Sequence, residues 1–114
     1  MQFEELPECP VETTLKLIGD KWKALIIRDL LTGTKRFNEL KKSVKGISQK
    51  VLTSNLRSLA KDGLVKREVF PEVPPRVEYT LTDVGYSLMP VLNAMAGWGT
   101  DYKEFRKLLN KLNK

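Results

Sequence analysis

The chain has 114 residues, of which 41% are hydrophobic and 30% charged, and its formal net charge is +6 at pH 7. This composition predicts one soluble domain with its own core (residues 1–114), and no apolar run reaches the roughly 20 residues of a membrane span. Because the chain has no histidine and one cysteine, Cys9, it lacks the commonest general base and the ligands of a zinc or iron–sulfur site, so we expect no enzymatic activity, metal or cofactor.

Two helices are predicted in residues 10–32. Pro10 suits the first turn of a helix, where its missing N–H leaves no hydrogen bond unmade. Gly19 interrupts the pattern, Asp20 is a suitable N-cap for the second helix, and Thr32-Gly33 ends it. In the first helix the apolar residues with helical spacing are Val11, Leu15, Leu17 and Ile18. In the second helix the apolar residues form a broad face that is typical of a core: Trp22, Leu25, Ile26, Leu30 and Leu31.

A basic turn at Lys35-Arg36 leads to two more predicted helices in residues 37–62. The first of these is short and is followed by a tight turn at Lys45-Gly46. Ser48 is a suitable N-cap for the longer helix, which ends at Gly63. The residues expected to be buried are Phe37, Leu40 and Val44 in the short helix, and Val51 or Leu52, Leu56 and Leu59 in the long one.

Residues 64–81 have the pattern of a β-hairpin. The segments 64–70 and 76–81 are rich in β-branched and aromatic residues, which favour strands. Between them, Pro71-Glu-Val-Pro-Pro75 cannot hydrogen-bond into a sheet, so we expect a stiff loop beside the preceding helix. Helix, tight turn, helix and hairpin are the parts of a winged helix-turn-helix, and the predicted fold class is mainly α with a small β-hairpin (α+β).

The chain is expected to be helical again over residues 82–112, with Thr82 as N-cap. Pro90 should kink this segment, and Gly97-Trp98-Gly99 should loosen it. Large apolar residues recur at intervals of three and four, which is the spacing of a heptad seam: Leu88, Val91, Met95, Trp98, Tyr102, Phe105, Leu109 and Leu112.

This apolar stripe predicts a homodimer, because so many large side chains are rarely left in water. We expect Leu88 and Val91 to pack onto the first helices of the same chain. The expected dimer interface comprises Met95, Trp98, Tyr102, Phe105, Leu109 and Leu112. The alternative is that the whole stripe packs within its own chain.

The positive charge of the chain lies in its middle third. Residues 33–67 hold ten Lys/Arg and two Asp/Glu, whereas residues 1–32 hold four and six, and residues 68–114 hold six of each. A basic segment that coincides with a helix-turn-helix pattern indicates a surface for a polyanion, and here the natural one is duplex DNA.

The helix after Ser48 is expected to enter the major groove, which is about 12 Å wide. The candidate base-contacting residues are Gln49, Lys50, Thr53, Ser54 and Arg57. The candidate residues for the sugar-phosphate backbone are Lys35, Arg36, Lys41, Lys42, Lys45, Ser48 and, from the base of the hairpin, Arg76. An ordinary solvated helix face would explain the polar residues alone, but the concentration of charge and the hairpin favour DNA binding.

Several short motifs between residues 9 and 99 occur together in one known family. They are Cys9-Pro10, Gly19-Asp-Lys-Trp22, Arg36-Phe-Asn-Glu-Leu40, Gly46-Ile-Ser48, Val51-Leu52, Leu56-Arg57, Asp62-Gly-Leu-Val65, Pro71-Glu-Val-Pro-Pro-Arg-Val-Glu-Tyr79, Leu81-Thr82, Gly85 and Trp98-Gly99. With these motifs the chain resembles the HxlR family of winged-helix (MarR-like) bacterial transcription regulators. The resemblance implies a homodimer that binds an inverted-repeat operator and switches transcription in response to a signal, and we expect a repressor. Gln49, Thr53, Ser54 and Asn55 lie where such proteins would differ to choose operators.

Cys9 is a candidate redox sensor. It lies at the start of the first helix, where the helix dipole favours a thiolate, although Glu4, Glu5, Glu8 and Glu12 oppose this effect. Some members of the family that the chain resembles use an N-terminal cysteine to sense oxidants or electrophiles. The alternative is a small buried residue near the dimer interface. A single cysteine is also typical of the reducing cytoplasm, where we expect the protein.

Two other functions remain open. A nonspecific nucleic-acid-binding protein is one, although the basic segment lacks exposed aromatic residues for base stacking. The other is a regulator controlled not through Cys9 but by a small ligand at the dimer seam, where Met95, Trp98 and Tyr102 would line a pocket.

Overall fold

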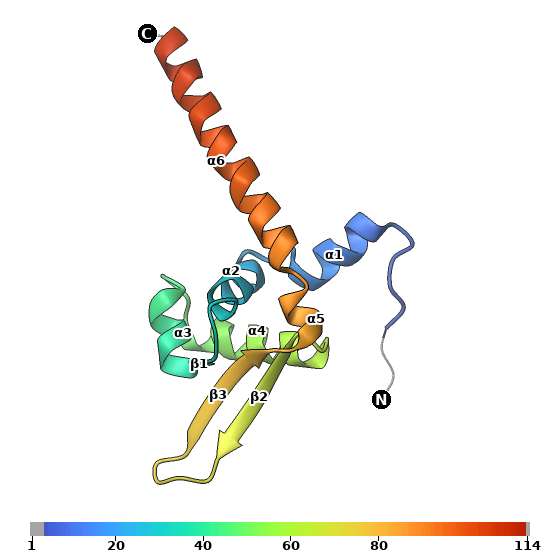
Figure 1. The fold of residues 1–114 in the computed structure, drawn as a ribbon, viewed down its shortest axis with the longest axis vertical. Coiled ribbons are helices and arrows are strands. Elements are labelled where there is room, and N and C mark those ends of the chain that lie inside the picture. Colours follow the sequence, from blue (N-terminus) through green and yellow to red (C-terminus); the bar gives the residue numbers. More distant parts are fainter. Residues whose placement is uncertain (1–3, 114) are drawn as a thin grey trace.

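The structure is a computed structural model and describes residues 4–113. A body of short helices carries a small sheet on one side and a single long helix that projects from the other (Figure 1). The helices are α1 (Pro10–Ile18), α2 (Lys21–Leu30), α3 (Phe37–Ser43), α4 (Gln49–Lys61), α5 (Asp83–Tyr86) and α6 (Met89–Leu112). The strands are β1 (Lys35–Arg36), β2 (Val65–Phe70) and β3 (Arg76–Leu81). The predicted winged helix-turn-helix, mainly α with a hairpin, is confirmed.

The predicted N-caps are confirmed at three helices. The Asp20 carboxylate accepts a hydrogen bond from the backbone N–H of Trp22 at 2.7 Å, and the Ser48 hydroxyl accepts one from Val51 at 3.1 Å. Thr82 caps α5 in the same way, through the N–H of Gly85. Each cap gives a partner to a backbone donor that the first turn of a helix leaves without one.

The core lies between α2, α4 and the sheet. Its most deeply buried side chains are Ile26, Ile27, Leu30, Leu40, Val44, Leu52 and Leu59. In α1 only Ile18 is buried, whereas Val11 and Leu15 are exposed, so the apolar spacing of this segment indicates a helix but not a core face.

The sheet has three strands where the sequence predicted two. Its order is β1-β3-β2 and both pairs are antiparallel. Lys35 and Arg36, predicted as a turn, form β1 and pair with Tyr79 and Glu78 of β3. Because Tyr79 is buried against the core, β3 fixes both β1 and the hairpin, or wing, to the helical body.

The C-terminal segment differs from the prediction in two ways. Pro90 does not kink a helix: the chain breaks between α5 and α6, and Pro90 lies in the first turn of α6, where its missing N–H costs nothing. The helix then continues without interruption through Gly97-Trp98-Gly99 for 24 residues, or about 36 Å.

The prediction that Leu88 and Val91 pack onto the body of the same chain is correct for one of the two residues. Leu88 packs against the core as expected, but its partner there is Leu92, and Val91 lies on the exposed side. Beyond this first turn α6 leaves the body, which it contacts through α2 (Figure 1). No helix within residues 4–113 is both long and apolar enough to cross a membrane.

Candidate nucleic-acid interface

The N-terminal half of α4 presents its polar side chains to solvent. Leu52, Leu56 and Leu59 hold the opposite face of the helix in the core. The five residues predicted to contact bases line one open groove on the exposed side: Gln49, Lys50, Thr53, Ser54 and Arg57. The structure therefore brings all five together on one helix face, whose length and side-chain chemistry suit a major groove.

Asn55 does not belong to this face. Its side chain is 8% exposed, and its Nδ2 donates a hydrogen bond to the Val51 carbonyl at 2.9 Å. The expectation that Asn55 contributes to operator choice is therefore wrong, because a buried amide engaged with its own helix is not presented to a base edge.

The predicted phosphate-contacting residues of this region lie on α3, in the turn that follows it and at the start of α4. Lys41 and Lys42 lie exposed on α3, Lys45 follows in the turn, and Ser48 caps α4. Among the ion pairs of residues 4–113 none involves these lysines, Lys50 or Arg57, so their charges are available to an anion.

Two further residues predicted to contact phosphates, Lys35 and Arg36, form β1 at one edge of the sheet. Lys35 Nζ donates to the Thr32 hydroxyl at 3.1 Å, and the backbone N–H of Arg36 donates to the Glu39 carboxylate at 2.8 Å. Glu39 is thereby used to cap α3, and the guanidinium of Arg36 stays exposed beside α3.

α3 is fastened to α2 by a carboxylate. Asp29 accepts from the Ser43 hydroxyl and from Arg28 Nε, both at 2.7 Å. Burial of the carboxyl opposes ionisation, but the hydrogen bonds from Arg28 and Ser43 and the charges of Arg28 and Lys35 outweigh it, so the pKa of Asp29 is lowered. This contact sets the position of the lysines on α3 relative to the rest of the body.

Arg76 lies at the tip of the wing and not at its base, as the sequence suggested. It is the first residue of β3, directly after the 71–75 loop, and its register partner is Phe70. Its guanidinium pairs with Glu72 at 2.8 Å and Glu78 at 2.7 Å and stacks 3.9 Å from the centre of the Phe70 ring. Two carboxylates therefore more than offset the charge of Arg76, whereas within residues 4–113 the lysines of α3 and α4 have no such partners.

A second groove joins α4 to the wing. It is lined by Thr53, Leu56, Arg57, Ala60, Arg67 and Tyr79. Arg67 of β2 consequently lies next to Arg57, on the side of the wing that faces the helix. Arg67 was not predicted from the sequence, because only the register of the hairpin shows which strand residues face α4.

The predicted dimer stripe is exposed in the single chain. Trp98 is 69% exposed, Tyr102 41% and Phe105 51%, and the first two rings stack at 5.3 Å between centroids. Met95, Leu109 and Leu112 continue the stripe, with Leu108 beside it. No other element within residues 4–113 covers these side chains, which argues against packing of the stripe within its own chain.

Cys9 is exposed and is the N-cap residue of α1. Its side chain makes no capping hydrogen bond, while its carbonyl accepts from Thr13 N at 3.0 Å. The alternative of a buried structural cysteine does not apply to the single chain.

Known proteins are similar to this chain in both sequence and fold. The HTH-type transcriptional regulator YdeP of Bacillus subtilis is 48% identical over 101 residues, which are 89% of this chain and 79% of YdeP. The redox regulator HypR, in its oxidised form, superimposes with a TM-score of 0.77 at 47% identity over 82% of this chain and 96% of HypR. Reduced YodB from B. subtilis gives 0.71 at 41% identity over 81% and 91% of the two chains. The model of HxlR-like helix-turn-helix proteins matches residues 17–107, so the chain belongs to the HxlR family of DNA-binding transcription regulators.

Proposed function

We propose that this regulator acts as a homodimer that binds an inverted-repeat operator in duplex DNA and represses transcription, without enzymatic activity. The observation that carries the proposal is the single groove on α4 that contains Gln49, Lys50, Thr53, Ser54 and Arg57. Arg and Lys recognise guanine, Gln recognises adenine, and the Thr methyl group contacts thymine, so this groove has the chemistry for several base pairs.

The surrounding lysines supply affinity without sequence preference. Lys41, Lys42 and Lys45, from α3 and the turn before α4, would neutralise phosphates, and Ser48 would present the N-terminus of α4 to another. We assign the same role to Lys35 and Arg36. Arg76 was also selected from the sequence, but its two carboxylate partners reduce its value for phosphate binding.

Dimerisation would give the operator its symmetry. A pair of chains joined along α6 would present two α4 helices, and half-sites about 34 Å apart would lie on one face of the DNA. We propose that Met95, Trp98, Tyr102, Phe105, Leu109 and Leu112 form this interface, and that residues 1–114 act as one unit.

Selection from a random duplex library at about 150 mM salt tests the proposal. We expect an inverted repeat with half-sites about one turn apart. Arg57→Ala should weaken binding of the selected site by about 1–3 kcal/mol and relax preference at one base pair, whereas Lys42→Ala should weaken all sequences and reduce the salt slope by about 0.9. Lys107→Ala on the far end of α6 is the matched control. Salt-sensitive binding without a consensus would identify a nonspecific nucleic-acid-binding protein.

We also propose that Cys9 senses oxidants. Two similar structures support this: HypR is described as a redox regulator, and YodB is known in a reduced form. The exposure of Cys9 gives oxidants access to its sulfur, and a reducing cytoplasm would keep it a thiol until stress occurs. Diamide should change operator affinity of the wild type and leave Cys9→Ser unaffected. Equal responses of the two proteins would exclude Cys9 as the sensor.

A further inference from the structure

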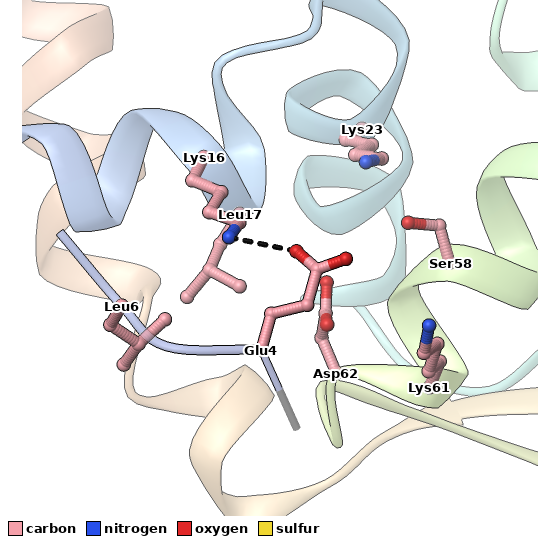
Figure 2. Close-up of a pocket in the computed structure, with 8 residues that line it drawn as sticks. All are labelled: Glu4, Leu6, Lys16, Leu17, Lys23, Ser58, Lys61 and Asp62. Carbon is pink, nitrogen blue, oxygen red and sulfur yellow. Dashed lines mark ion pairs between the residues drawn. The ribbon is translucent and has the colours of Figure 1, made fainter. Parts of the chain in front are cut away.

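A cavity of about 580 Å³ lies beside the C-terminal end of α4, next to the exposed helix face that carries the base-contacting groove. Four parts of the chain contribute to it: the segment before α1, α1 itself, α2, and the C-terminal end of α4 (Figure 2). The lining residues are Glu4, Leu6, Lys16, Leu17, Lys23, Ser58, Lys61 and Asp62. Its volume is within the range of small-molecule sites.

The lining combines an apolar wall with several ammonium groups. Leu6 and Leu17 form the apolar part, and Lys16, Lys23 and Lys61 approach from three different helices (Figure 2). Because only Glu4 and Asp62 carry negative charge here, the lysines are in excess by one. An amphipathic anion would satisfy both parts of such a lining.

One corner of the cavity already holds a carboxylate from the chain itself. Glu4 pairs with Lys16 at 3.0 Å, as Figure 2 shows. The hydrogen bond from Lys16 and the charges of Lys16 and Lys61 lower the pKa of Glu4, so the surroundings favour a negative group.

Two of the ammonium groups have no such partner. Lys23 of α2 and Lys61 of α4 take part in none of the ion pairs within residues 4–113. Ser58, which is also on α4, directs its hydroxyl toward the cavity, in the region between Lys23 and Lys61 (Figure 2). Lys23, Lys61 and Ser58 thus offer donors to a second carboxylate, with Leu6 and Leu17 available to its apolar body.

We propose that this cavity is an effector site for a small organic carboxylate with an apolar body, held by Lys23, Lys61 and Ser58 and resting on Leu6 and Leu17. The site is separate from both Cys9 and the α6 stripe. Since Ser58 and Lys61 belong to α4, a bound carboxylate joins the base-contacting helix to α1 and α2 and changes DNA affinity. That second part rests on the proposed function, whereas carboxylate binding itself does not.

The test uses benzoate as the probe and the full chain without DNA. Calorimetric titration should give a dissociation constant below about 1 mM for benzoate, and benzamide, which has the same shape but no charge, should bind about tenfold more weakly or worse. The double variant Lys23→Gln/Lys61→Gln should lose about tenfold in benzoate affinity, and Lys107→Gln should bind as the wild type does.

Equal affinity for benzoate and benzamide would overturn the proposal, as would no benzoate binding up to about 10 mM. The comparison of the two probes needs no variant, so it holds even when the double variant folds poorly. Operator affinity is then measured with and without benzoate. Because binding is recorded in the absence of DNA, a failed carboxylate site and a failed regulator proposal give different results.

Discussion

The α6 stripe gives the sharpest test of the assembly, through Trp98→Ala. The indole is 69% exposed in the single chain. A fully buried tryptophan covers up to about 250 Å², so about 170 Å² of this ring is left for a partner to cover. At about 25 cal/mol per Å² this area corresponds to about 4 kcal/mol per chain, and to twice that for the two rings of a symmetric dimer.

A dimer that covers half of this area on each ring loses about 4 kcal/mol in the variant. Its dissociation constant should then rise about a thousandfold, as measured by sedimentation equilibrium over a concentration series. The fold of each chain should remain, because Trp98 stacks on Tyr102 of its own helix and belongs to no core cluster.

Val69→Ala is the matched control for this measurement. Val69 is also a half-exposed apolar residue, at 49%, but it lies on the wing, at the opposite side of the body from α6 (Figure 1). Its truncation should leave the dissociation constant within about threefold of the wild type. If Trp98→Ala and Val69→Ala dimerise equally well, or if the wild type is a monomer at about 100 μM, the assembly along α6 is refuted.

Three further predictions concern stability at a fixed protein concentration. Asp20→Ala removes the N-cap of α2 and should lower the free energy of unfolding by about 1 kcal/mol in urea titrations. The lowered pKa of Asp29 means that its contribution is complete above the unfolded-state value and is lost as pH falls through the folded-state value. Between about pH 5 and about pH 3 the wild type should therefore lose more stability than Asp29→Asn, and parallel curves would contradict this. Gly85→Ala places a methyl group against the Leu64 carbonyl and should cost about 1–3 kcal/mol, whereas Gly97→Ala, which meets nothing within 4 Å, should not lower the melting temperature.

Features that depend on neighbouring residues were predictable from the sequence. Asp20, Ser48 and Thr82 cap their helices because the hydrogen bond they accept comes from two or three residues further on. The groove on α4 followed from the same local periodicity. Its five polar residues share one face once the leucines occupy the other.

Features that depend on distant residues were not predictable. β1 is two residues long and exists because Lys35 and Arg36 meet β3, more than 40 positions later. Lys23 and Lys61 line the same cavity only in the folded chain, so no sequence pattern marks the cavity beside the end of α4. Pro90 shows a different limit: a proline can end one helix or begin the next, and here it lies in the first turn of α6, between Leu88 and Leu92, which pack against the core.

The junction between α5 and α6 has a mechanical consequence. Within residues 4–113, α6 contacts the body near its first turn, through Leu88 and Leu92, so any change of angle at Ser87 and Leu88 would be amplified along an arm about 36 Å long. A rotation of about 10° at this junction displaces the far end of the arm by about 6 Å, close to the length of two base-pair steps. In the proposed dimer joined along these arms, the stiffness of this junction would limit which half-site spacings of the proposed operator are tolerated.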